Sequence, residues 1–143
     1  MKKALIVAGG WDGHQPKQCG ALMAEVLRKE GFEVEVSETM DVYLDEAKMK
    51  ALSLIVPIWT MGNITGEQSK GLLSAIKAGV GCAGFHGGMG DAFRSNCEYQ
   101  FMVGGQFVGH PDGIIEYQVD IVNKHDPITK GLNAFKIKSE QYY

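Results

Sequence analysis

Hydrophobic and polar positions along the chain follow two patterns: short apolar runs and longer stretches with helical spacing. The apolar runs at residues 4–8 and 53–58 are typical of strands buried on both faces, and residues 81–85 form a further predicted strand. Residues 32–36 instead alternate strictly between apolar and acidic side chains, which predicts a strand with one wet face. In a parallel sheet such a strand belongs at an edge.

The first predicted helix begins near Pro16, a residue that suits a first helical turn, and ends before Gly31. Its apolar residues recur at helical spacing and predict one stripe that packs on the sheet. The stripe consists of Cys19, Leu22, Met23, Val26 and Leu27. Further helices are predicted at residues 45–52, 67–78 and 91–103, and further strands at residues 114–122 and 135–138.

Strands and helices that alternate in this way indicate an α/β fold with right-handed crossovers. We predict a flavodoxin-like three-layer sandwich with a mainly parallel sheet, formed by a single domain over residues 1–143. Nineteen of the 143 residues are glycine, nearly twice the usual ~7%. Glycine-rich loops follow the first, third and fourth strands and should converge at one edge. Ligands of such folds bind there, outside the carboxyl ends of the strands.

Charge and apolar content exclude several classes of protein. The 14 basic and 17 acidic side chains are interspersed, so no basic stripe is available to neutralise phosphates and nucleic acid is not a predicted partner. No apolar stretch approaches membrane-spanning length, and the run after the N-terminal lysines is too short for a signal peptide. Three cysteines without metal-ligand spacing favour a reduced, cytoplasmic setting.

The sharpest local feature is the sequence Gly-Phe-His-Gly-Gly, centred on His86. It is typical of a strand–turn–helix elbow, in which flanking glycines permit a strained turn that presents the middle residue. The N–H groups of the next helix, at Gly87 and Gly88, could then face a developing anion. Histidine can act there as a general acid or base. The alternative is a histidine that merely caps the helix or bonds a backbone carbonyl.

The other histidines give weaker signals. His14 lies beside Trp11 on the loop after the first strand, where ligand binding and plain loop surface are equally plausible. His110 lies on a second glycine-rich loop, and His125 is typical of a turn. No pair of histidines has helical metal-ligand spacing, and no dinucleotide or Walker pattern is present. We therefore predict neither a metal nor a cofactor.

Four segments in order carry a resemblance to a known family: GFHGG, GGQFVGHPD, HDPITKGL and the closing FKIKSEQYY. Together they resemble the ThuA-like (trehalose utilisation) family of the class I glutamine amidotransferase-like superfamily. The resemblance implies a flavodoxin-like sheet and a role in the metabolism of trehalose or a related sugar. It implies functional positions at His86, His110 and Glu140. Relatives that transfer amide nitrogen carry a Cys where this chain has His86, so Cys-dependent glutaminase chemistry is not expected.

Two further expectations follow from the resemblance. The chain is expected to be short at its C-terminal end relative to the family. As an enzyme, it would be a sugar-directed hydrolase or isomerase in which His86 is the acid/base, Glu140 a second proton-transfer group and His110 an orienting donor. Residues expected to bind the saccharide are Trp11, His14, Trp59, Gly87 and Gly88. Both tryptophans are expected on loops, where each could stack against a sugar ring or merely anchor its loop.

Two alternatives stay open. The first is a module that binds a saccharide or a protein without turnover. The second is a metal-dependent hydrolase that assembles several histidines. An unpaired sheet edge also makes a homo-oligomer plausible.

Overall fold

The computed structural model describes all residues from 1 to 143. Contacts between residues divide the chain into two compact units, Met1–Gln106 and Phe107–Tyr143, and each unit is described separately. The prediction of a single domain over residues 1–143 stays a prediction.

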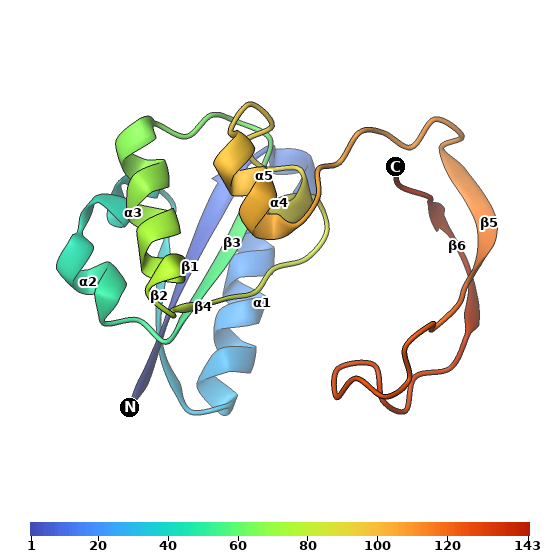
Figure 1. Ribbon diagram of the computed structural model, residues 1–143, viewed down its shortest axis with the longest axis horizontal. Coiled ribbons are helices and arrows are strands. Elements are labelled where there is room, and N and C mark those ends of the chain that lie inside the picture. Colours follow the sequence, from blue (N-terminus) through green and yellow to red (C-terminus); the bar gives the residue numbers. More distant parts are fainter. The chain divides into compact units, whose positions relative to one another are not determined.

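The first unit contains a four-stranded sheet in the order β2-β1-β3-β4, and all of its strand pairs are parallel (Figure 1). The strands are β1 (Lys2–Gly10), β2 (Phe32–Ser37), β3 (Leu54–Thr60) and β4 (Gly81–Cys82). This is the strand order of flavodoxin-like folds, and it confirms the predicted fold class. The alternating strand, β2, lies at an edge of the sheet, as its pattern predicted.

Five helices connect the strands and follow them. They are α1 (Pro16–Lys29), α2 (Glu46–Lys50), α3 (Gly66–Lys77), α4 (Gly87–Gly90) and α5 (Cys97–Val103). Short 3₁₀ turns lie at Asp12–His14 and Met40–Leu44. Thr65 and Gln68 form a reciprocal capping box that fixes the start of α3.

The core lies on both faces of the sheet because successive side chains of a strand point to opposite sides. On β1, Leu5 and Val7 face a cluster built with α2, α3 and α5, whereas Ile6 and Ala8 face a cluster built with α1. These side chains are almost completely buried. Both faces are therefore covered by helices, which is the predicted three-layer arrangement.

The face by which α1 packs on the sheet differs from the predicted stripe. Gly20 and Ala24 are buried, whereas Leu22 and Val26 are exposed. A Cβ atom at Gly20 would lie 3.1 Å from the Cβ of Ala8, so small residues let the helix lie close to β1. The stripe prediction was wrong for Leu22 and Val26 because helical spacing of large apolar residues does not reveal a contact made by small ones.

Three other predicted boundaries need correction. The strand predicted at residues 81–85 ends at Cys82, with one further ladder bond from Ala83 N–H to the Ile55 carbonyl. Trp59 lies within β3 and not on a loop. The helix predicted at residues 91–103 begins only at Cys97, because residues 91–93 form a bridge to the segment after β3.

The second unit is built around an antiparallel pair, β5 (Ile114–Val119) and β6 (Phe135–Glu140). The strand predicted at residues 114–122 therefore ends three residues early, and neither strand belongs to the parallel sheet. The C-terminal Tyr143 also pairs with Gly109 through backbone hydrogen bonds in both directions. No helix in either unit is both long and apolar enough to cross a membrane.

Two leucines on helices test the assignment of buried and exposed faces. Leu72 on α3 is 0% exposed, and Leu22 on α1 is 62% exposed. We expect Leu72→Ala to lower the free energy of unfolding by about 2–5 kcal/mol because it leaves a cavity in the core. Leu22→Ala should change the free energy of unfolding by less than about 0.5 kcal/mol. Urea denaturation of both variants measures these changes in the free energy of unfolding. A loss at Leu22→Ala as large as that at Leu72→Ala would contradict the packing of α1.

Candidate functional site

The loops after β1, β3 and β4 meet at the carboxyl ends of the strands. The backbone N–H of Trp11 donates to the Thr60 carbonyl over 3.1 Å, which ties the loop after β1 to the end of β3. Met61 forms a parallel bridge with Ala92, in the segment after α4. The predicted convergence of these loops is confirmed.

His86 occupies the turn between β4 and α4. Its backbone has φ 53° and ψ −151°, values that residues other than glycine rarely adopt. The Nδ1 atom of His86 accepts a hydrogen bond from the Gly87 N–H and so caps α4. The elbow conformation predicted for His86 is confirmed, and the residue also makes the capping interaction that was the structural alternative.

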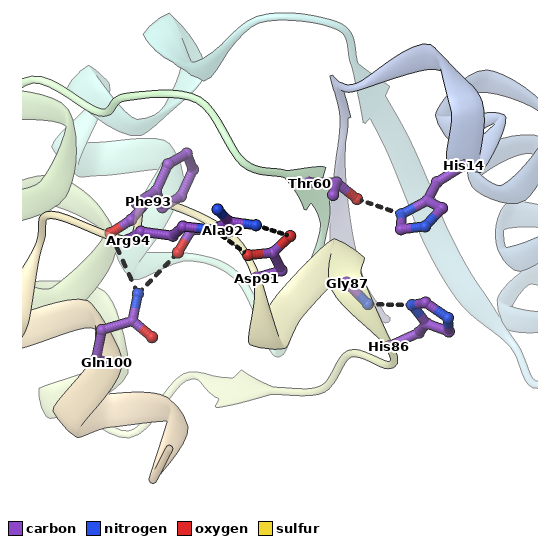
Figure 2. A network of polar contacts seen from close by, with 9 residues as sticks. All are labelled: His14, Thr60, His86, Gly87, Asp91, Ala92, Phe93, Arg94 and Gln100. Atoms are coloured by element: carbon purple, nitrogen blue, oxygen red, sulfur yellow. Dashed lines mark hydrogen bonds and ion pairs between the residues drawn. The ribbon is translucent and has the colours of Figure 1, made fainter. Parts of the chain in front are cut away.

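His14 stands next to His86. Its Nδ1 atom lies 2.9 Å from the hydroxyl oxygen of Thr60, a buried residue at the end of β3. The His14 and His86 rings meet edge to face with centroids 4.8 Å apart, and the ring of Trp11 lies at the same distance from His14. Figure 2 shows both imidazoles extending to the same side of α4. The pairing of these histidines and the part played by Thr60 were not predicted.

A cleft of about 180 Å³ lies between the two histidines and α1. Phe85 and Ile58 contribute apolar surface to it, and Thr60 contributes a hydroxyl group. The full lining consists of His14, Pro16, Cys19, Ile58, Thr60, Phe85, His86 and Gly88. An apolar cleft with a few convergent polar groups at the carboxyl ends of parallel strands is a typical small-molecule site.

The glycines after His86 permit close packing. A Cβ atom at Gly87 would lie 2.7 Å from Cε1 of His14, and one at Gly88 would lie 3.2 Å from Cα of Ile58. Gly87 therefore leaves room for the His14 ring. A contact of Gly87 or Gly88 with a saccharide stays a prediction.

The two tryptophans occupy different environments. Trp11 is 51% exposed beside His14, so its ring is available to a ligand. Trp59 packs against the core, and Cβ atoms at Gly9 and Gly62 would collide with its ring. Its indole Nε1 is buried without a hydrogen-bond partner. These contacts favour an anchoring role for Trp59, and stacking on a sugar stays a prediction.

A polar network lies at the C-terminal end of α4. Asp91 is 5% exposed, and its carboxylate makes a two-point contact with the guanidinium of Arg94, which raises the pKa of Arg94 (Figure 2). The amide of Gln100 donates to the carbonyls of Ala92 and Phe93, at 2.8 and 3.2 Å. Phe93 has φ 50°, so these bonds stabilise a strained backbone. No sequence motif pointed to this network.

The other two predicted site residues lie together in the second unit. His110 Nε2 is 3.5 Å from a carboxylate oxygen of Glu140, and the hydroxyl of Tyr142 donates to the other oxygen. The rings of Phe107, His110 and Tyr142 contact one another. Burial, followed by the hydrogen bond to Glu140, raises the pKa of Tyr142 to about 12. Tyr142 was not identified from the sequence, although it lies within the closing FKIKSEQYY segment.

The predicted site residues thus form two groups. Trp11, His14, His86, Gly87 and Gly88 belong to the first unit, and His110 and Glu140 to the second. No group of three or more His, Cys, Asp or Glu side chains is arranged to hold a metal ion.

Comparison with known families decides the relationship that the motifs indicated. The ThuA family, described as trehalose utilisation, matches residues 3–143. The chain belongs to the ThuA family. A similar solved structure is that of a protein from Bacteroides uniformis described as ThuA-like, with a TM-score of 0.77 and 22% sequence identity. The match covers 99% of this chain and 60% of the Bacteroides protein, and it supports the shared fold. No curated protein matches the chain.

Two glycines of α4 test the packing of His14 in this member of the ThuA family. Gly87→Ala should lower the free energy of unfolding by about 1 kcal/mol, because the new methyl group displaces His14 from Thr60. Gly90→Ala meets no atom within 4 Å and should raise it by about 0.5–1 kcal/mol. Guanidinium denaturation of both variants provides the comparison. A stabilised Gly87→Ala protein would show that His14 does not occupy this position.

The Tyr142–Glu140 contact predicts that the stability of this ThuA-family chain depends on pH. Because the folded-state pKa of Tyr142 is about 12, above the ~10 of an unfolded tyrosine, its contribution to stability is complete below pH ~10 and is lost as the pH rises towards 12. Ultraviolet titration of the wild type against Tyr142→Phe isolates this group. Glu140→Gln should move its pKa back towards 10, and an unchanged titration curve would rule out the contact.

Proposed function

We propose that this ThuA-family chain acts on trehalose or a related sugar as a hydrolase or isomerase, with His86 as the acid/base residue. The observation that carries the proposal is the strained conformation of His86 at the mouth of a cleft, at the carboxyl ends of parallel strands. Ligands of flavodoxin-like folds bind at these strand ends. The family relationship supplies the substrate class.

Backbone strain supports a functional role for His86. A residue in a sparsely populated region of φ and ψ costs about 1–3 kcal/mol, and such residues cluster at active sites. Glycine would adopt the same backbone conformation without this cost. A histidine at this position is therefore better explained by its imidazole than by the turn alone.

The remaining residue roles are proposed for each unit separately. Trp11 presents an exposed ring beside His14 and suits stacking against a sugar. In the second unit, Glu140 is assigned the second proton-transfer role and His110 that of an orienting donor, since their side chains form a pair.

A second function is a saccharide-binding module without turnover. One observation favours it: Nδ1 of His86 is already engaged as the cap of α4. A histidine kept for capping would still shape the cleft but would transfer no proton.

Two variants of His86 separate strain from chemistry. His86→Gly should be more stable than His86→Ala by about 1 kcal/mol, because only glycine relieves the backbone strain. Both variants should lose turnover of trehalose or glucose by about 10²–10⁴-fold, the usual contribution of acid/base catalysis. Product chromatography and thermal unfolding measure the two effects.

His125→Gln is the matched control because His125 is exposed and belongs to neither group of predicted site residues. It should retain the wild-type rate.

A ligand at ~100 times its dissociation constant stabilises a protein by ~2.7 kcal/mol, so sugar binding is visible as a thermal shift. A sugar-induced shift without turnover in the wild type would replace the enzyme proposal with the binding module.

A further inference from the structure

We propose that His14 is a second catalytic residue, that Thr60 positions it, and that His14 and His86 together move a proton between adjacent carbons of a monosaccharide that has an open-chain carbonyl. The proposal rests on the proposed function and deepens it, because it selects isomerisation over hydrolysis and a single sugar over a disaccharide. It also gives His14 the second proton-transfer role, in place of Glu140. Four observations carry it, and each concerns the first unit alone.

The hydrogen bond to Gly87 defines the tautomer of His86. Because Nδ1 accepts the Gly87 N–H, it carries no proton, and the proton of the neutral ring lies on Nε2. His86 is thereby a hydrogen-bond donor through Nε2. This is the role of the group that polarises a carbonyl oxygen.

Thr60 gives His14 the complementary role. The Thr60 side chain is 2% exposed and fixed at the end of β3, and its hydroxyl oxygen lies 2.9 Å from Nδ1 of His14. When Nδ1–H donates to this oxygen, Nε2 of His14 carries a lone pair and can accept a proton. The proposal assigns His14 this tautomer.

The distance between the rings favours chemistry at neighbouring atoms. The two imidazoles are in contact, with centroids 4.8 Å apart, and both line the same cleft. Glycoside hydrolysis typically uses a pair of carboxyl groups, and no carboxyl group lines this cleft. Two adjoining imidazoles instead address adjacent atoms of one bound molecule.

The volume of the cleft restricts the substrate. At about 180 Å³ it lies below the roughly 300–1,000 Å³ of pockets that hold drug-sized ligands. One sugar unit suits such a volume better than a disaccharide. The apolar surface of Ile58 and Phe85 can cover the carbon face of that unit.

The proton-transfer step balances without a cofactor. Nε2 of His14 takes a proton from the carbon next to the carbonyl, and the released C–H electron pair forms a carbon–carbon double bond. The carbonyl π pair moves to oxygen, which is held by Nε2–H of His86. That oxygen then takes the Nε2 proton of His86, and the hydroxyl group on the neighbouring carbon gives its own proton to Nε2 in return. His14 finally passes its proton to the former carbonyl carbon, and the neighbouring carbon becomes the new carbonyl.

The first test reads the tautomers without a substrate. Nitrogen NMR of ¹⁵N-histidine-labelled protein, assigned with His14→Gln and His86→Gln, should show Nε2–H on His86 and Nδ1–H on His14. Thr60→Val, which removes the hydroxyl at nearly constant volume, should abolish the single-tautomer signature of His14, and Thr60→Ser should restore it. Nδ1–H on His86, or a His14 signal indifferent to Thr60→Val, overturns the assignment.

The second test reads the chemistry with D-glucose and D-fructose in D₂O. Proton NMR should show loss of the carbon-bound hydrogen next to the carbonyl in the presence of the wild-type protein. His14→Gln and His86→Gln should each slow this exchange about 100-fold or more. Thr60→Val should slow it about tenfold and Thr60→Ser should restore it, whereas His125→Gln should have no effect.

The outcomes separate this inference from the proposed function. Exchange that persists in His14→Gln but is lost in His86→Gln overturns the role of His14 and leaves the proposed function standing. Trehalose hydrolysis without hydrogen exchange overturns the isomerase inference and also leaves the proposed function. Absence of exchange and hydrolysis in the wild type overturns both.

Discussion

The carboxyl end of β3 is the point on which the arrangement of the first unit's site depends. The Thr60 carbonyl accepts the Trp11 N–H, and the Thr60 hydroxyl meets the His14 ring. One residue later, the Met61 N–H donates to the Asp91 carbonyl over 2.9 Å, and the Met61 carbonyl accepts from Phe93. A buried strand end thus connects the loop after β1 with the segment after α4. His14 lies on the first of these segments, and His86 begins the short helix α4 that leads into the second.

Much of the fold follows from the sequence because the burial of a strand determines the order of apolar and polar residues along it. The apolar run of β1 and the strict alternation of β2 correctly separated a central strand from an edge strand. The errors arose where local pattern and tertiary contact disagree. Gly20 and Ala24 pack α1 on the sheet although neither belongs to a large apolar stripe. The pairing of β5 with β6 depends on a partner distant in sequence, which alternation alone does not specify.

The candidate site was predictable only in its most local part. The glycines around His86 indicated a turn, and the structure has that turn with φ 53°. The contact between His14 and His86 spans 72 positions of the sequence and depends on Thr60, a residue with no motif of its own. The buried Asp91 and its partner Arg94 were missed for a different reason: a charged pair at i and i+3 normally indicates an exposed helix face. Here the carboxylate is buried at the C-terminal end of α4.

The central claim is that the strained elbow of His86 presents an imidazole to a sugar in the cleft beside His14. A crystal structure of the protein grown with D-glucose tests this most directly. We expect that structure to have a positive φ at His86 and one sugar within hydrogen-bond distance of the Nε2 atom of His86, against Phe85 and Ile58. A sugar bound elsewhere on the protein, or His86 with an ordinary negative φ, would contradict it.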